Sequence, residues 1–210
     1  MNRIHCYYFL ISLSKFIKES NKFKLLNKLI NKKIVITGGP GSGKTEIIKE
    51  LENRGYYVKH EIVRILYKKG EKKGVNAFKK DPFGFSEKLL EYRINQFDSS
   101  SKINYNIEKP YIFFDRGVHD TFAYLNFLNK TYNYKNIIFS ISYDFVFLLN
   151  PWKKIYVNDN ERMESFSDSR KLFNSIKLIY SEAKIKSKII LNDSVKNRVD
   201  YIINYLNHIQ

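Results

Sequence analysis

A glycine-rich segment that ends in lysine and threonine carries the clearest chemical information in this sequence. It spans residues 38–45 and satisfies the phosphate-loop pattern G-x-x-x-x-G-K-[ST] in full. The backbone N–H groups of such a loop, together with the N-terminus of the helix that follows, bind polyphosphate. The residues expected to bind a nucleotide are therefore Gly38, Gly39, Pro40, Gly41, Ser42, Gly43, Lys44 and Thr45.

Two side chains of this loop have predictable roles. Lys44 would place its charge at the β- and γ-phosphates of a nucleotide, and the Thr45 hydroxyl would hold Mg²⁺. The flanking sequence fits, because Ile34–Ile36 is a β-branched run typical of a buried parallel strand. Residues 46–51 then place apolar side chains at helical spacing. The sequence thus predicts a nucleotide site that uses Mg²⁺ and a catalytic lysine.

An acid and an arginine follow a second apolar run. Residues 111–114 are apolar and lead to Asp115, and an acid at the carboxyl end of a strand lies beside the phosphate loop in open α/β sheets. Asp115 is expected to join the Mg²⁺ shell or act as a base, with helix capping as the alternative. Arg116 offers a rigid fork and is expected to bind the acceptor substrate, with a surface ion pair as the alternative.

An acceptor pocket is expected beside these residues. Glu61 comes directly after a strand predicted at 56–59 and would orient or deprotonate an acceptor hydroxyl. An exposed ion pair between Glu61 and Arg64 explains the same spacing nearly as well. Gln96, on a predicted long helix, would complete the pocket, although an exposed glutamine is the simpler interpretation.

A lid is expected after the fourth predicted strand. Residues 158–162 open a late helix in the place where a mobile lid would bring an arginine to the transferring phosphate. Arg162 is the first candidate for that role and Arg170 the second. His119 follows Asp115 closely, but a solvated helix start explains it better than a role in the site.

The elements that position these residues alternate along the chain, which predicts an α/β fold around a parallel sheet. The long helix should begin at an Asp81 cap and bury Phe85, Leu89, Leu90, Tyr92 and Phe97. A late helix is expected over 159–186, interrupted by Ser and Asp at 165–169. The other strands and helices are predicted at 111–114, 118–128, 145–149, 188–191 and, after Asp193 or Ser194, 195–208.

Composition sets further bounds on this chain of 210 residues. A single cysteine, Cys6, excludes a disulfide framework and fits a reducing, cytoplasmic compartment. The formal charge of +16 comes from lysines scattered over the whole length, which favours biased composition over a nucleic-acid-binding function. We expect a monomer or homodimer with one P-loop domain at 33–210. Residues 1–32 form a basic amphipathic extension, expected to be an accessory helix or an upstream extension, with a signal peptide or a helix on an anionic membrane surface as alternatives.

From Lys33 onward the sequence resembles the AAA-type P-loop group that contains the ribosylnicotinamide-kinase module of NadR and many bacterial predicted ATPases. The resemblance rests on the phosphate loop, on Asp-Arg-Gly at 115–117, on Pro151-Trp152 and on the segment around Arg162. It implies a nucleoside-kinase-like three-layer αβα sandwich with strand order 2-3-1-4-5 that binds ATP or GTP. Members often carry two adjacent arginines in the lid, whereas here Met163 follows Arg162.

Two hypotheses of different class follow. The first is a small-molecule kinase that moves the γ-phosphate of Mg-ATP to a nucleoside-like hydroxyl acceptor. The second is a nucleotide-dependent regulatory NTPase that has no small-molecule acceptor. The Asn-Lys-x-Asp pattern of guanine-specific proteins is missing, since Asn129-Lys130 is followed by no aspartate at the required position, so ATP is preferred over GTP.

Overall fold

A five-stranded parallel sheet forms the centre of the computed structural model, which describes residues 30–62, 81–130, 135–156 and 165–209. The order β2-β3-β1-β4-β5 confirms the predicted 2-3-1-4-5 arrangement. The register sets Ile36 beside Asp115 on one side of β1 and beside Phe147 on the other. The strands are β1 (Lys32–Gly38), β2 (Tyr57–Lys59), β3 (Tyr111–Asp115), β4 (Phe145–Leu149) and β5 (Ser187–Ile190).

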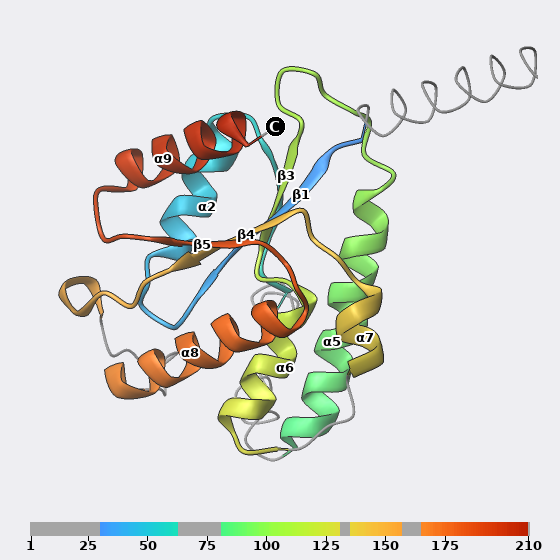
Figure 1. Ribbon diagram of the computed structural model, residues 1–210, viewed down its shortest axis with the longest axis vertical. Helices are drawn as coiled ribbons and strands as arrows, with labels where there is room; N and C mark the ends of the chain where they lie inside the picture. Colours follow the sequence, from blue (N-terminus) through green and yellow to red (C-terminus); the bar gives the residue numbers. More distant parts are fainter. Residues whose placement is uncertain (1–29, 63–80, 131–134, 157–164, 210) are drawn as a thin grey trace, which may run out of the picture.

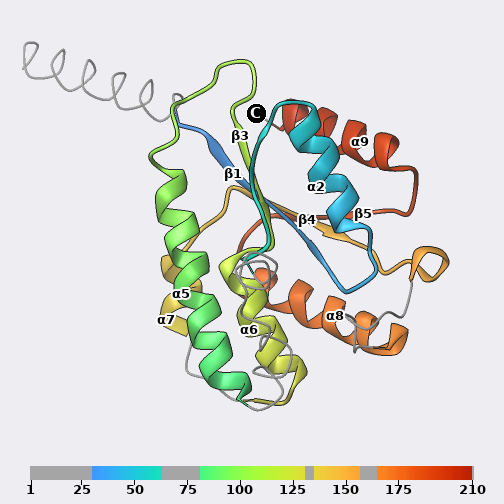
Figure 2. The same cartoon turned by 180° about the vertical axis from the view of Figure 1, so that it is seen from behind.

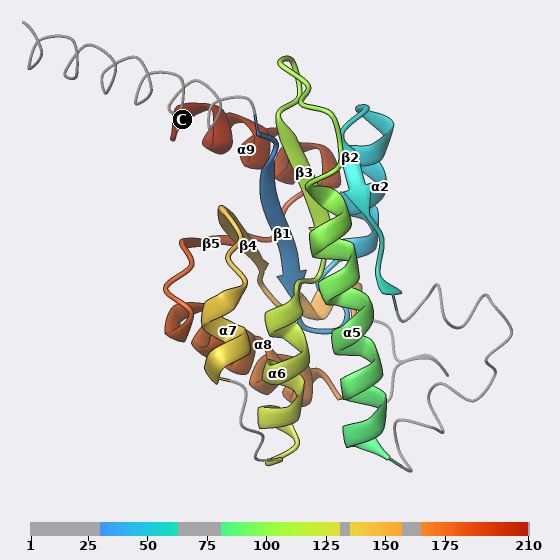
Figure 3. The same cartoon turned by 90° about the vertical axis from the view of Figure 1, so that its right-hand side faces the viewer.

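Helices cover both faces of this sheet, which makes the predicted three layers (Figures 1 and 2). On one face, α2 (Lys44–Asn53) and α9 (Val195–His208) pack on the inward side chains Ile34 and Ile36. On the other, Val35 packs in a core formed with α5 (Pro82–Ser100), α6 (Val118–Phe127), α7 (Lys135–Ser140) and α8 (Phe166–Glu182). Figure 3 shows α5 and α6 side by side on this second face. Neighbouring residues of β1 therefore serve opposite layers, as the pleat of a strand requires.

Helix capping confirms two predicted boundaries and corrects a third. Asp81 accepts a hydrogen bond from the Gly84 N–H at the start of α5, and Ser194 accepts one from the Asn197 N–H at the start of α9. The Ser/Asp segment at 165–169 was expected to interrupt a helix, but it begins one. Ser165 is the N-cap of α8 and forms a reciprocal capping box with Asp168, which explains the local composition.

Smaller differences concern packing and short elements. Tyr92 was expected in the core, but it is 40% exposed because it lies on the outer side of α5. The strand β5 begins and ends one residue before the predicted range, and α7 and the short 3-10 helix η1 (Lys153–Ile155) have no counterpart in the sequence prediction. Most of the N-terminal extension, residues 63–80 and the predicted lid at 158–162 lie outside the described residues. Within the described ranges, the helices lack the combination of length and apolar character needed to cross a bilayer.

Candidate active site

The phosphate loop joins β1 to α2 and takes a backbone form that explains its glycines. Gly41 and Gly43 have φ angles of 70° and 82°, in the left-handed region that favours glycine. Gly43 is also the N-cap of α2, so the loop passes directly into a helix N-terminus. The partial positive charge at that end adds to the backbone N–H groups of the loop in favouring an anion.

The side chain of Lys44 lies across the loop. Its Nζ donates to the carbonyl oxygens of Gly38 and Gly39, both at 2.8 Å, and to Ser42 Oγ at 3.3 Å. Burial, and next the nearby charge of Arg116, lower the pKa of Lys44 from 10.5 to about 7, although the carboxylates of Asp115, Glu61 and Asp120 oppose the change. A negative ligand at this place would favour the protonated amine.

Two helices, α8 and α9, donate side-chain hydrogen bonds to backbone carbonyls of the phosphate loop. Ser169, on α8, donates its hydroxyl to the Pro40 carbonyl at 2.7 Å. Arg198, on α9, donates from Nη2 to the Ser42 carbonyl at 3.1 Å. The loop conformation therefore depends on helices from both faces of the sheet.

A carboxylate held between two arginines lies beside the loop. Glu61 Oε1 is 2.9 Å from Arg93 Nη2, and Glu61 Oε2 is 2.5 Å from Arg116 Nε. The three side chains are 11%, 5% and 17% exposed, in the order Glu61, Arg93 and Arg116. Arg116 Nη1 also lies 3.4 Å from the Gly38 carbonyl, which connects this cluster to the phosphate loop. The structure thus brings Glu61, Arg116 and the loop together, as the sequence predicted.

Glu61 is buried and pairs with Arg93 and Arg116, which contradicts the exposed position that the ion-pair alternative required. Arg64, the partner expected in that alternative, lies outside the described residues. Arg116 itself is bound by the protein's own carboxylates. Burial alone would lower its pKa, but the charges of Glu61, Asp120 and Asp115 outweigh burial and raise it. Its backbone φ of 72° is uncommon for a non-glycine residue, and its N–H donates to the Ile36 carbonyl at 3.1 Å. The fork of Arg116 is therefore fixed in place at the end of β3.

Asp120 connects the end of β1, the residues after β3 and α8 through one buried carboxylate. It accepts hydrogen bonds from the Thr37 hydroxyl, from the Gly117 N–H at 3.0 Å and from the Tyr180 hydroxyl at 2.7 Å. Arg116 Nη1 lies 3.3 Å away. Burial alone would raise the pKa of Asp120, but Arg116, Arg93 and the hydrogen bonds lower it. The carboxylate is suited to fixing these elements relative to one another.

The residues predicted to hold Mg²⁺ have suitable chemistry. Thr45 offers a hydroxyl in the first turn of α2, and Asp115, only 7% exposed, offers a carboxylate close enough to act on the pKa of Lys44. The described residues contain no group of three His, Cys, Asp or Glu that would form a complete metal site. Mg²⁺ commonly binds through one or two protein oxygens together with nucleotide phosphates and water, so this sparse donor set fits.

Other predicted residues have different outcomes. Gln96 donates its amide to the His60 carbonyl at 2.8 Å and so supports the backbone directly before Glu61. Arg170 is exposed on α8, while Arg64 and Arg162 lie outside the described residues. The solvated interpretation of His119 is wrong, because the side chain is fully buried and Nε2 lies 3.1 Å from the Ile138 carbonyl.

Sequence reasoning missed four buried polar residues of the site, namely Arg93, Asp120, Tyr180 and Arg198. A signal for two of them was present. Arg93 follows Leu89 by one helical step of four residues, and Arg198 precedes Val199 on the apolar side of α9. A charged residue within an apolar stripe indicates a buried partner.

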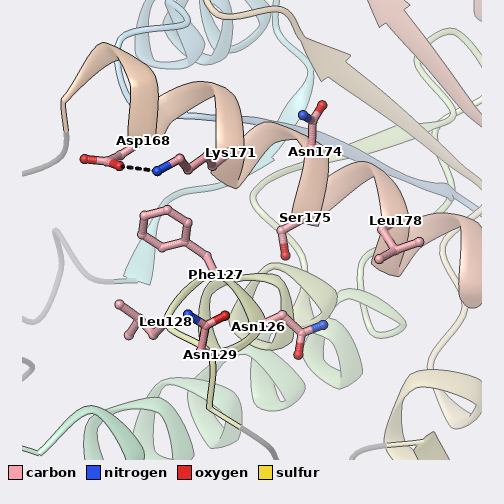
Figure 4. A pocket seen from close by; sticks show the side chains of 9 residues that line it. All are labelled: Asn126, Phe127, Leu128, Asn129, Asp168, Lys171, Asn174, Ser175 and Leu178. Carbon is pink, nitrogen blue, oxygen red and sulfur yellow. Dashed lines mark ion pairs between the residues drawn. The ribbon is translucent and has the colours of Figure 1, made fainter.

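A hollow of about 650 Å³ lies away from the loop, between the end of α6 and α8 (Figure 4). The hydroxyl of Ser175 bridges the two helices there, donating to the Ala123 carbonyl at 2.7 Å. Asp168 and Lys171 form an ion pair of 3.7 Å across one turn of α8 at its rim. The phosphate-loop residues do not line this hollow, so the chemistry described above belongs to another part of the molecule.

The fold and the loop define the class of protein, a P-loop protein with a three-layer αβα fold of the nucleoside-kinase type. A family model described as an AAA domain matches residues 33–198, and the chain therefore belongs to this AAA-domain family. A search of curated proteins found no match.

Solved structures with the same fold include deoxyadenosine kinase from M. mycoides. The form with bound dATP is 20% identical, with a TM-score of 0.64, and the match covers 84% of this chain and 99% of that chain. The form with the products dCMP and a flexible dCDP is 21% identical, with a TM-score of 0.62 and the same coverage. At this level of identity, the likeness shows the kinase-like fold.

Proposed function

We propose that this protein is a kinase that transfers the γ-phosphoryl group of Mg-ATP to the hydroxyl of a nucleoside-like small molecule. The observation that carries the proposal is the Glu61 carboxylate, which two arginines hold beside the phosphate loop. A site for phosphate binding alone has no evident need of a fixed, buried carboxylate at its edge. A phosphotransferase uses such a group to position or deprotonate the attacking hydroxyl.

On the donor side, the loop N–H groups and Lys44 would bind the β- and γ-phosphates. Thr45 and Asp115 would hold Mg²⁺ together with phosphate oxygens. The ion neutralises the charge that develops on the phosphates during transfer. Lys44 would leave the loop carbonyls of Gly38 and Gly39, which it contacts at 2.8 Å, to reach the phosphates.

On the acceptor side, Glu61 would accept the hydroxyl proton. Within the part of the chain that the structure describes, each oxygen of Glu61 has one arginine contact. A carboxylate oxygen carries two lone pairs, so each has capacity for a further hydrogen bond. Arg93 and Arg116 would prevent rotation of the carboxylate, which keeps the attacking oxygen oriented. Arg162 remains the proposed lid residue for charge on the transferring group.

The nucleoside class of acceptor rests on similarity. The M. mycoides deoxyadenosine kinase structures share the fold over most of this chain and contain deoxynucleotides. That supports a nucleoside as the first acceptor to try, while the base and sugar have to be found by experiment. ATP is the proposed donor, with GTP as the alternative.

A transfer screen tests the proposal. Purified protein is incubated with Mg²⁺ and ATP or GTP against ribonucleosides, deoxynucleosides, nucleotides and a no-acceptor control, and phosphorylated products are detected by mass. We expect an acceptor-dependent product with wild type and none with Lys44→Ala. Nucleotide hydrolysis that does not respond to any acceptor would replace the kinase with the regulatory NTPase.

A further inference from the structure

Besides Lys44, a second cationic side chain, Arg198, contacts the phosphate loop. It comes from α9, on the face of the sheet opposite to that of Asp120. Arg198 is 4% exposed and projects from the apolar side of α9, next to Val199. Its Nη2 donates to the Ser42 carbonyl at 3.1 Å. A methyl group placed on Gly43 would lie 3.2 Å from both Nη1 and Nη2, so the guanidinium group is in close contact with the loop backbone.

The charge of Arg198 is poorly compensated. Its Nε is buried without a hydrogen-bond partner, and among the described residues no carboxylate lies within ion-pair distance. Burial lowers the pKa of Arg198, and the more distant Asp193 opposes this only in part. The group also lies at the N-cap of α2, where the helix dipole disfavours a cation. A buried charge that lacks an oppositely charged partner destabilises the fold that contains it.

This arrangement would be unfavourable unless an anion binds at the loop. Lys44 is buried on the same loop, and its Nζ donates to the carbonyl oxygens of Gly38 and Gly39. Two cations and a helix N-terminus thus converge on eight residues. A bound polyphosphate would stabilise both cations, because its negative charge compensates for the hydration that burial removes.

We infer that Arg198 is a positioning residue for the phosphate loop, one that fixes the Ser42 carbonyl and whose uncompensated charge is matched by nucleotide phosphates. The inference rests on nucleotide binding under the proposed function and adds a role for α9. It predicts opposite effects of Arg198 on two measured properties. Arg198 lowers the stability of the protein without nucleotide, and it raises the affinity for ATP.

The experiment compares Arg198→Met and Arg198→Lys with wild type, by calorimetric binding of ATP, ADP and adenosine and by thermal unfolding. We expect Arg198→Met to keep or raise the melting temperature of the ligand-free protein. It should weaken ATP binding at least about tenfold, which is ~1.4 kcal/mol. The loss should be smaller for ADP and near zero for adenosine. Arg198→Lys should bind ATP more tightly than Arg198→Met, because it retains the charge.

Arg54→Met is the matched control. Arg54 joins α2 to α9 at the far end of α2, through Glu50 at 2.8 Å and Asp200 at 2.5 Å. Its loss should lower the melting temperature and leave ATP affinity unchanged. The opposite pattern in Arg198→Met, a destabilised ligand-free protein with wild-type ATP affinity, would show that Arg198 is merely structural.

The outcomes separate this inference from the proposed function. If wild type binds ATP but transfers no phosphate, the kinase proposal fails, and the binding ratios still decide the role of Arg198. If transfer occurs and Arg198→Met binds ATP as wild type does, only the role of Arg198 is overturned. Absence of ATP binding by wild type would overturn both. If Arg198→Met does not fold, Arg198→Lys decides the test. An ATP affinity equal to that of wild type, with the same discrimination between ATP and adenosine, would show that the guanidinium fork is not needed.

Discussion

Lys44 is buried, yet its proposed role at the nucleotide phosphates requires a positive charge, and this has a measurable consequence. Its pKa is about 7 in the folded protein against an ordinary value of 10.5, chiefly because of burial and then because of the charge of Arg116. Between these pH values the unfolded chain binds more protons than the folded one, so Lys44 makes the ligand-free protein more stable as pH rises through that window. Bound phosphate favours the protonated amine of Lys44, whereas burial favours the neutral amine.

We therefore predict proton uptake on ATP binding at pH 8, where the terminal phosphate is already mostly ionised. ATP affinity should fall as pH rises above about 7, the pKa of the free Lys44 amine. Calorimetry in two buffers of different ionisation enthalpy measures the uptake, with Lys44→Met as control. Identical heats in both buffers would show that ATP binding takes up no proton and would contradict this prediction.

Arg116 is suited to bridging rather than to a single contact. Its Nε meets Glu61 at 2.5 Å, and its Nη1 lies 3.3 Å from Asp120. A lysine retains the charge but lacks the fork, so Arg116→Lys should leave one carboxylate without its partner. We predict acceptor turnover reduced about tenfold or more with little change in ATP affinity. Steady-state kinetics with each substrate varied tests this, and Arg54→Lys is the control. Equal losses for both substrates would contradict the assignment of Arg116 to the acceptor side.

At the scale of elements, α8 is the helix that links the phosphate loop to the buried carboxylate. Its first turn carries Ser169, which contacts Pro40, and its last turns carry Tyr180, which contacts Asp120. One helix therefore carries both contacts. The residues proposed as a lid come directly before it.

Gly39→Ala tests the first contact. A Cβ on Gly39 would lie 2.5 Å from both the carbonyl oxygen and the Oγ of Ser169, so α8 or the loop must move. We predict a melting temperature lower by about 2–12 °C, from an overpacking cost of ~1–3 kcal/mol, together with weaker ATP binding. Ser169→Ala should have the smaller effect, because it removes only the hydroxyl. Ser169→Gly should not rescue Gly39→Ala, since the carbonyl stays, and a full rescue would refute this packing argument.

Tyr180→Phe tests the second contact. The hydroxyl of Tyr180 donates to Asp120 at 2.7 Å in a fully buried setting. Losing a hydrogen bond to a charged group is expected to lower the free energy of unfolding by about 2 kcal/mol, or the melting temperature by about 4–8 °C. Tyr201→Phe, at a side chain that is 43% exposed, is the control. Equal melting temperatures for Tyr180→Phe and wild type would mean that Asp120 does not depend on α8.

At the scale of the whole molecule, the sheet was predictable because its strands are local patterns. Ile34–Ile36 and residues 111–114 and 145–149 are apolar runs bounded by clear breaks, and strands buried on both faces read this way. The loop was predictable because its backbone has positive φ angles at Gly41 and Gly43, which favour glycine. Asp115 and Glu61 followed from parallel topology, which brings strand ends to one edge.

The remaining part of the site depends on contacts that no local pattern contains. Arg93 and Glu61 are 32 positions apart, and Arg198 and Ser42 are 156 positions apart, so their pairing is decided by how helices lie on the sheet. His119 appeared solvated because it follows a polar turn, yet α6 turns that residue into the core. The short helix α7 has too few residues to establish a period.

The central claim, transfer of phosphate to an acceptor held at Glu61, is tested most directly by following the label of γ-radiolabelled ATP. The measurement is the ratio of label in phosphorylated acceptor to label in inorganic phosphate, for wild type and for Glu61→Gln, whose ATP binding is checked in parallel. We predict that wild type puts most label into a nucleoside acceptor and that Glu61→Gln binds ATP normally but transfers almost none. Label released only as inorganic phosphate at the same rate with and without acceptor, or transfer by Glu61→Gln equal to wild type, would contradict the claim.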